Sequence, residues 1–274
     1  MRKIEIACLL FDDISIRLRI FERTMKLYLD DIHYIDTDEP MDISIPLSDS
    51  AKNPRAWYVD QPKFEAVRTE HYVGSIKEGG SVNFRNIQFN PHGHGTHTEC
   101  LGHITSKIYS VNETLKNFFF RASLKSIKPH EKSNEDGELD FIITPEQIDL
   151  NDFKSEALII RTLPNIADKR SMNYSSTNPT YLDSLCAKKI CAAGVKHFLI
   201  DLPSVDREKD NGELAFHHEF WEVPENPNHE RTITELIFVD DSILDGEYIL
   251  NIQMAPFEND ASPSRPILYK VKER

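Results

Sequence analysis

The sequence has few positive charges for its length. Its 274 residues include 32 Lys and Arg against 45 Asp and Glu, which gives a formal net charge of −13. It has no basic cluster that could attract phosphate groups, so nucleic acid and anionic membranes are excluded as expected partners. No apolar run approaches the ~18–20 residues that cross a bilayer, and we expect no transmembrane helix.

Cysteine is also scarce. The four cysteines form no CxxC motif and are too sparse for a disulfide-rich secreted scaffold, which favours free thiols at Cys8, Cys100, Cys186 and Cys191. The first residues, Met1-Arg2-Lys3, are basic, but Glu5 and the short apolar run over residues 6–11 make a poor signal peptide. We therefore expect a soluble, globular protein of the cytoplasm.

Internal repeats and low-complexity linkers are absent as well, which favours a single domain, and a chain of this length can bury a substantial core. Residues 157–162 form a continuous apolar run typical of a buried strand. Residues 179–194 have helical spacing, and residues 196–201 have the pattern of another strand. This strand–helix–strand order predicts a parallel α/β unit. His197, at the start of the second strand, is expected to be structural.

One segment is rich in side chains that can bind a metal or act in catalysis. Four of the eleven histidines and a carboxylate fall within twelve residues: His92, His94, His97, Glu99 and His103. Imidazole and carboxylate groups together are the usual ligands of a borderline divalent metal such as Zn²⁺. If the segment is extended, His97, Glu99 and His103 share parity and face one side. Residues 81–89 alternate polar and apolar side chains and predict a strand that leads into this cluster. We therefore predict a metal or catalytic site here.

The letters GTHTECLGH within this cluster resemble the H-x-G-T-H-x-D-x-P-x-H signature of the cyclase family. This family comprises metal-dependent hydrolases that include bacterial kynurenine formamidase and isatin hydrolase. Glu99 stands at the Asp position of the signature and Leu101 at the Pro position. The first His of the signature falls at Gly93, between His92 and His94. Either one of these neighbours supplies that ligand, or the ligand has been lost.

Further segments resemble family elements in the family's order: residues 42–47 (DISIPL), 201–206 (DLPSVD), 216–221 (FHHEFW), 232–236 (TITEL) and 260–266 (DASPSRP). The family closes its metal site with a His and then a Glu. His217 or His218 would supply the His, and Glu235 the Glu. Trp57 lies where the family carries an aromatic residue that lines the substrate pocket, although a core position is an equal alternative. The resemblance spans about residues 42–271.

The resemblance implies a single α/β domain with the swivelling β/β/α cyclase-like fold, in which a mixed sheet packs against helices. We expect this domain to span residues 25–274, because Met25 opens a plausible start for such a chain, and residues 1–24 to be an N-terminal extension. Because family members commonly associate, we also expect a homodimer or homotetramer.

For function, the resemblance implies a hydrolase in which a metal-activated water attacks an amide carbonyl (N-formyl or cyclic amide) or a related ester or lactone. Kynurenine formamidase (arylformamidase) is the family member whose activity the resemblance suggests for this protein. The metal would lower the pKa of its water from ~15.7 toward ~7. His103 would shuttle the proton, and Trp57 would contact the small-molecule substrate.

The ligand set implied by the resemblance binds one or two divalent ions, with Zn²⁺ expected and Mn²⁺ the alternative. It consists of His92 (or His94), His97, Glu99, His217 (or His218) and Glu235. The second hypothesis is a degenerate family member that keeps the fold, holds no catalytic metal and acts as a binding or interaction protein.

Overall fold

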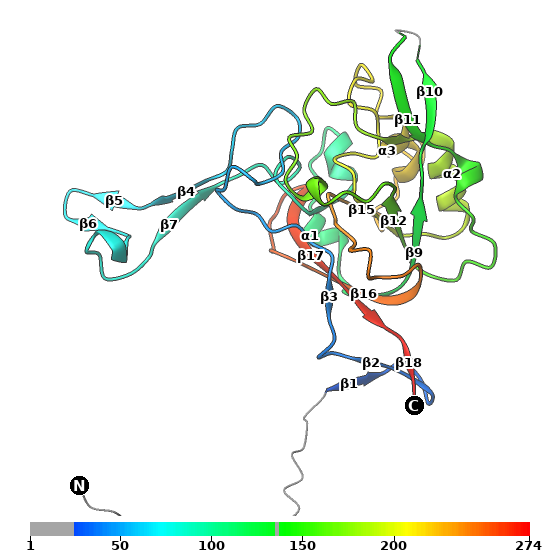
Figure 1. The fold of residues 1–274 in the computed structure, drawn as a ribbon, viewed down its shortest axis with the longest axis horizontal. Coiled ribbons are helices and arrows are strands. Elements are labelled where there is room, and N and C mark those ends of the chain that lie inside the picture. The colour runs from blue at the N-terminus through cyan, green and yellow to red at the C-terminus, as the bar shows by residue number, and fades with distance from the viewer. Residues whose placement is uncertain (1–24, 135–136) are drawn as a thin grey trace, which may run out of the picture.

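The computed structural model describes residues 25–134 and 137–274, and its centre is a closed, barrel-like sheet of seven strands (Figure 1). In order around the sheet they are β16 (Gly246–Met254), β9 (Phe119–Ile127), β12 (Ala157–Thr162), β14 (His197–Ile200), β15 (Thr232–Glu235), β8 (His97–Glu99) and β17 (Ala261–Lys270). Pairing of β16 with β17 closes the ring, and β3 (Met41–Asp42) extends it beside β17. The sheet is mixed: β9, β12, β14 and β15 run parallel, and the other pairings are antiparallel.

The predicted parallel α/β unit is confirmed, with α2 (Ser184–Ala192) connecting β12 to β14. The prediction placed the start of this helix five residues too early. Residues 181–182 are instead a short strand, β13 (Tyr181–Leu182), which pairs with β11 (Leu139–Ile143). The helix begins only where the side chain of Asp183 accepts a hydrogen bond from the Leu185 N–H, which satisfies an exposed donor of its first turn.

Two hydrophobic clusters lie on opposite faces of the central strands. Side chains alternate along a strand, so Leu158 and Ile160 of β12 pack with α2 and α3 (Ala215–Trp221), while Ile159 packs with residues of the other barrel strands. The first cluster includes three large buried aromatic side chains of α3: Phe216, Phe220 and Trp221. Their burial fixes α3 against the sheet, and with it the polar residues on the same helix.

Smaller elements surround the barrel. Short sheets are formed by β1 (Lys26–Tyr28), β2 (His33–Asp36) and β18 (Lys272–Glu273); by β10 (His130–Ser133), β11 and β13; by β4 (Lys63–Ala66) and β7 (Arg85–Gln88); and by β5 (Arg68–Thr69) and β6 (Tyr72–Val73). The remaining helical turns are η1 (Ile76–Glu78), η2 (Leu101–Ile104), α1 (Val111–Thr114), η3 (Pro145–Gln147) and η4 (Ala167–Arg170).

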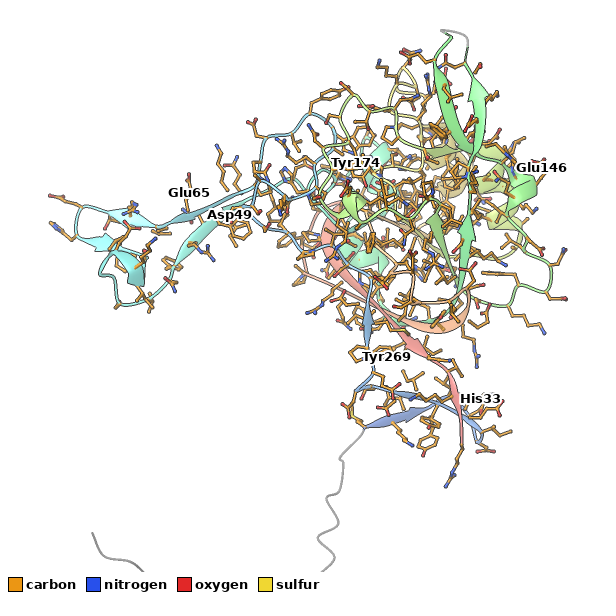
Figure 2. All side chains as sticks on the ribbon, in the orientation of Figure 1. His33, Asp49, Glu65, Glu146, Tyr174 and Tyr269 are labelled. Atoms are coloured by element: carbon orange, nitrogen blue, oxygen red, sulfur yellow. The ribbon has the colours of Figure 1, made fainter. Side chains whose placement is uncertain are left out.

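The segment from β4 to β7 projects from the barrel as a long arm (Figures 1 and 2). Residues 81–89, expected to be one strand, contain only the four residues of β7, because the chain before Arg85 forms the irregular tip of this arm. Among the residues described, no helix is long and apolar enough to cross a membrane. The expected N-terminal extension, residues 1–24, lies outside the described residues.

Candidate metal centre

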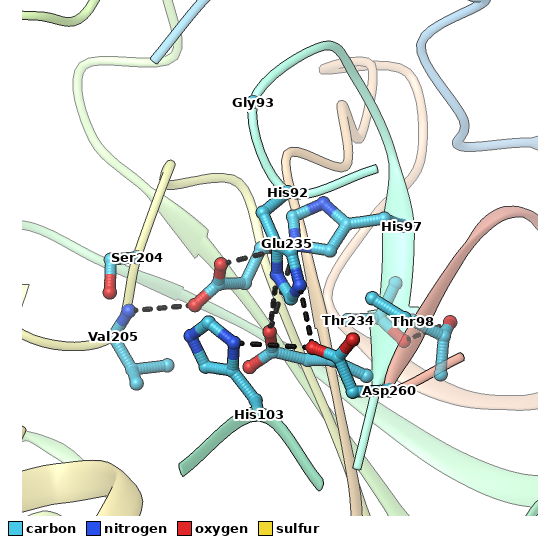
Figure 3. Close-up of polar contacts among 12 residues, drawn as sticks. His92, Gly93, His97, Thr98, His103, Ser204, Val205, Thr234, Glu235 and Asp260 are labelled. Carbon is cyan, nitrogen blue, oxygen red and sulfur yellow. Dashed lines mark hydrogen bonds and ion pairs between the residues drawn. The ribbon is translucent and has the colours of Figure 1, made fainter. Parts of the chain in front are cut away.

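Two neighbouring barrel strands carry the first three polar side chains of the site. Strands β8 and β15 pair antiparallel with His97 opposite Glu235, and His97 and Glu99 share a face because they are two residues apart. All three side chains are buried. The Nε2 atom of His97 lies 3.5 Å from Oε2 of Glu235 and 3.9 Å from Oε2 of Glu99. Two stretches of chain nearly 140 residues apart therefore meet in one cluster (Figure 3).

Helix α3 adds one histidine of its pair. The Nε2 atom of His217 lies 3.1 Å from Oε1 of Glu99 and 4.0 Å from Oε1 of Glu235. His218 is directed elsewhere, and its Nδ1 donates to the carbonyl oxygen of Val223. Of the two alternatives in the sequence, His217 is the one that joins the cluster.

The loop before β8 resolves the choice between His92 and His94. The Nδ1 atom of His92 lies 3.0 Å from Oε2 of Glu99. His94 instead donates from Nε2 to the Asp60 carbonyl oxygen and accepts at Nδ1 from the Asn90 N–H. Both ring nitrogens of His94 are thus occupied away from the cluster, while His92 faces it (Figure 3).

Gly93 shows why the histidine is displaced by one residue. A Cβ atom at this position would lie 2.8 Å from Cγ2 of Val59 and 3.1 Å from the carbonyl oxygen of Ala56. Real Cβ contacts are essentially never as short as 2.8 Å and are seldom as short as 3.1 Å, so a side chain at position 93 would require Val59 and the backbone at Ala56 to shift. The histidine at position 92 occupies the cluster instead.

In each histidine of the cluster, the ring nitrogen that faces away from Glu99 and Glu235 donates a hydrogen bond to another part of the chain. His97 donates from Nδ1 to the Gly95 carbonyl oxygen at 3.0 Å, His217 donates from Nδ1 to Asp206 at 2.5 Å, and His92 donates from Nε2 to Asp260 at 2.8 Å. This arrangement fixes the tautomer of each ring. The opposite nitrogens face Glu99 and Glu235, and these are the nitrogens that would lose a proton on binding a metal.

At the centre of the cluster, the buried Nε2 atom of His97 has no hydrogen-bond partner among the described residues. Burying an unpaired polar atom is costly, so a native structure usually supplies it with a partner such as an ion. Imidazole nitrogens and carboxylate oxygens form the donor set of a Zn²⁺ or Mn²⁺ site. The residues present therefore fit a divalent metal.

The pKa shifts within the cluster also indicate a site that favours a cation. Burial opposes protonation of His92, but the hydrogen bonds and charges of Asp260 and Glu99 outweigh it and raise its pKa to about 10. His217 responds alike: its burial is outweighed by Asp206 and Glu99, and its pKa lies well above the ordinary value. The pKa of Glu99 lies well below its usual range, because the surrounding histidines outweigh its burial. The carboxylates thus favour positive charge at this point.

Comparison with known protein families shows to which family the chain belongs. The Cyclase family model matches residues 41–207, which is more than half of the 274 residues. The chain belongs to the Cyclase family. A search of curated proteins found no match.

Solved structures share the cyclase fold with this chain. A predicted metal-dependent hydrolase from Bacillus stearothermophilus is 16% identical with a TM-score of 0.58, and the match covers 84% of this chain and 98% of that one. An isatin hydrolase bound to the product analogue thioisatinate is 13% identical with a TM-score of 0.56, covering 85% and 93% of the two chains. Isatin hydrolase A from Ralstonia solanacearum is 14% identical with a TM-score of 0.57, covering 84% and 91%.

In this cyclase-family site, His103 lies beside the cluster. It comes from η2, its Nδ1 lies 3.4 Å from Oδ2 of Asp260, and its ring stacks on that of His92 at 4.2 Å between centroids. About 30% of its side chain is exposed, and it lines a cavity of about 340 Å³. His103 therefore has the access to a bound molecule that the fully buried His97 lacks.

Trp57 lines the same cavity, together with Val59 and Leu214. Trp57 and Tyr58 both have positive φ angles, 60° and 59°, a conformation that bulky residues adopt rarely and at some energetic cost. Trp57 also packs against the buried side chains of Ala56, Tyr174 and Leu236. Trp57 therefore lines the cavity and packs against the core at once, and its contact with a substrate stays a prediction.

Two carboxylates of the site were not identified as functional from the sequence. Asp206 holds His217, and Asp260 holds both His92 and His103. Both open or close segments that resemble family motifs, DLPSVD and DASPSRP, and this was the available signal. Their contacts depend on tertiary packing, so sequence spacing did not reveal which histidine each would hold.

Proposed function

We propose that this protein is a metal-dependent hydrolase that acts on an amide carbonyl, N-formyl or cyclic, or on a related ester or lactone, with an arylformamidase-like activity as the leading candidate. The observation that supports it most is the convergence of His92, His97, Glu99, His217 and Glu235 in one cluster, where the buried Nε2 atom of His97 has no hydrogen-bond partner among the described residues. Isatin hydrolases share its fold, and their name denotes hydrolysis of a cyclic amide.

The proposed ligands are the Nδ1 atom of His92, the Nε2 atoms of His97 and His217, and the carboxylates of Glu99 and Glu235. A bound divalent metal, with Zn²⁺ preferred over Mn²⁺ for this histidine-rich set, would acidify water and polarise the substrate carbonyl. Glu235 is positioned for this role by the Val205 N–H, which donates to its Oε1 at 3.0 Å. One or two ions are compatible with the number of donors.

The proton chemistry is assigned to His103. Its Nδ1 lies 3.4 Å from Oδ2 of Asp260, so Nε2 is the atom to which we assign taking a proton from the attacking water and delivering it to the leaving group. Trp57, Val59 and Leu214 form the apolar wall that would orient the substrate ring and exclude water. The buried free thiols of Cys100 and Cys186 support a reducing compartment, and we propose the cytoplasm.

The test is hydrolysis of aryl formamides, lactones and isatin-like rings by protein supplied with Zn²⁺ or Mn²⁺. We expect turnover of at least one class, and a loss of about 10²-fold or more in kcat for His103→Ala. His130→Ala, on the exposed strand β10, is the matched control and should retain full activity. No turnover of any class, together with no uptake of metal, would favour the degenerate binding protein.

A further inference from the structure

Two stretches of chain that are far apart in the sequence form much of the cavity beside the metal centre. One contributes Trp57 and Val59, and the other is the segment over residues 204–214 that leads to α3 and includes Glu208. Tyr58 lies between Trp57 and Val59 in the sequence, and its hydroxyl contacts the Glu208 carboxylate. This contact connects the two parts of the cavity wall.

Glu208 accepts hydrogen bonds from three residues of two other loops. Its Oε1 accepts from the Tyr58 hydroxyl at 3.0 Å and from the Ser176 N–H at 2.6 Å, and its Oε2 accepts from the Asn178 N–H at 3.1 Å. Both oxygens are therefore used within the chain. The carboxylate acts as a connection between segments of the wall, and its role does not depend on a free charge.

All three donors have a left-handed backbone conformation, which residues other than glycine rarely adopt. Their φ angles are 59° at Tyr58, 63° at Ser176 and 47° at Asn178, and asparagine tolerates this conformation better than the other two. Such a conformation costs free energy and persists only where surrounding contacts hold it. Trp57, next to Tyr58, also has a positive φ of 60°. Glu208 is thus bonded to the residues that most need to be held.

The loops that carry Tyr58 and Ser176 are also joined to each other. The carbonyl oxygen of Arg55 accepts from the Tyr174 N–H at 2.7 Å, and the Tyr58 N–H donates to the Ser175 hydroxyl oxygen at 2.9 Å. The two loops therefore form one unit. Since the Tyr58 side chain is 67% exposed, its hydroxyl can reach Glu208 at the surface of the protein and connect this unit to the segment before α3.

We infer that Glu208 is a positioning residue of the cavity: it fixes the loop that carries Trp57 relative to the segment that leads to α3, and so sets the space available to the substrate. This inference rests on the proposed function, because it takes the cavity as the place of the substrate. A wall held in one position favours a flat ring that contacts the Trp57 indole. The substrate class that this wall selects has an aromatic or similarly planar group beside the scissile carbonyl.

The experiment compares two zinc-binding compounds that differ in the group that the wall can contact. Zinc-loaded protein is titrated by calorimetry with benzohydroxamate, which carries a planar ring, and with acetohydroxamate, which carries a methyl group. Both chelate zinc through the same atoms, so the ratio of their affinities reports on the wall. We expect this ratio to fall by about threefold to tenfold in Glu208→Ala, as for the loss of one aromatic contact. Tyr58→Phe, which removes one of the three hydrogen bonds, should lower it by a smaller factor.

The double variant separates this connection from independent effects on the structure. Because Tyr58 and Glu208 act through one hydrogen bond, Tyr58→Phe combined with Glu208→Ala is expected to lose no more than Glu208→Ala alone. Tyr28→Phe, on exposed β1, and Glu131→Ala, on exposed β10, remove the same two groups elsewhere and should leave the ratio unchanged.

A second measurement needs no metal. Acrylamide quenches the fluorescence of accessible tryptophans. Trp221 is fully buried and Trp57 is half-buried, so a change in quenching reports on Trp57. We expect quenching to increase in Glu208→Ala and in Tyr58→Phe, and to stay at the wild-type level in the two controls.

The inference is overturned if neither variant lowers the affinity ratio, if their losses add in the double variant, or if the quenching of Trp57 does not increase. Increased quenching in both variants of a protein that binds neither hydroxamate would support the positioning of Trp57 by Glu208 and reject the metal centre of the proposed function. A lowered ratio in a protein that hydrolyses no amide, ester or lactone would support the inference and reject the proposed activity.

Discussion

Single residues of the candidate metal centre are constrained by contacts on both sides. Glu99 is an example: its Oε1 lies 3.1 Å from Nε2 of His217, its Oε2 lies 3.0 Å from Nδ1 of His92, and its backbone is fixed in β8 between β15 and β17. The family signature has Asp at this position. The longer side chain of this protein therefore reaches its neighbours from a backbone that cannot easily move closer.

Substitution of Glu99 by Asp is predicted to weaken zinc binding by roughly tenfold or more, although it restores the residue of the family signature. Removing one methylene withdraws the carboxylate from both His92 and His217 while the strand stays in place. Competition with a chromophoric zinc chelator measures the affinity, and Glu131→Asp is the control. An affinity equal to or tighter than that of the wild-type protein would show that Glu99 is not a ligand.

At the scale of elements, the sequence contained the information for the central strands and less for their surroundings. Strands β12 and β14 were predictable because burial on both faces leaves a continuous apolar pattern, and α2 was predictable because its apolar residues recur at helical spacing. The early start assigned to α2 was wrong, because pairing of β13 with β11 is a long-range contact. The same limit applied to His92, whose selection over His94 depends on the packing of Gly93 against Val59.

Strand β14 carries a buried histidine that should make stability depend on pH. His197 contacts Thr232 of β15 and the ring of Phe120 on β9, and burial lowers its pKa to about 4, with a small contribution from Lys196. The unfolded chain, with an ordinary histidine pKa near 6.5, binds a proton more readily than the folded one. The stability that neutral His197 provides is therefore lost as the pH falls from about 6.5 toward 4.

We predict that the free energy of unfolding of the wild-type protein falls over this range by about 3 kcal/mol more than that of His197→Gln. Urea denaturation at a series of pH values measures the difference. His130→Gln, on exposed β10, should follow the wild-type curve. Parallel pH profiles for the wild-type protein and His197→Gln would contradict the burial of a neutral imidazole in this strand.

At the scale of the whole molecule, the projecting arm is amphipathic. Strands β4 and β7 place Phe64 opposite Ile87, with the Arg85 guanidinium 5.5 Å from the Phe64 ring, and the opposite face carries Lys63, Glu65, Asn86 and Gln88. Ile87 is 53% exposed, while Phe64 and Ala66 are half-buried, so this face is only partly covered within the chain. A two-stranded ribbon alone is only marginally stable in water.

We propose that a second copy of the chain covers this face, in the homodimer or homotetramer expected from the resemblance. The net charge of the arm supports a second copy of the chain as the partner that covers this face. Residues 63–88 carry a net charge of +1, from four Lys and Arg against three Glu, and since the whole chain carries −13 the remainder carries −14. The arm therefore does not share the negative charge through which the rest of the chain would repel another copy.

Ile87→Glu is predicted to convert the oligomer to monomer, because it places a charge within the apolar face. Asn86→Glu adds the same charge to the adjacent residue on the polar face and should leave the oligomer intact. Sedimentation velocity distinguishes the two. A wild-type monomer, or an equal effect of both substitutions, would reject the arm as the contact between copies.

The central claim is that distant segments of the chain converge to hold a divalent cation, and metal content tests it most directly. Elemental analysis of protein purified without chelator is compared with His97→Ala. We predict about one or two equivalents of zinc in the wild-type protein, a rise in melting temperature when Zn²⁺ or Mn²⁺ is added to stripped protein, and loss of both in the variant. Less than about a tenth of an equivalent, with no thermal shift on adding either ion, would contradict it.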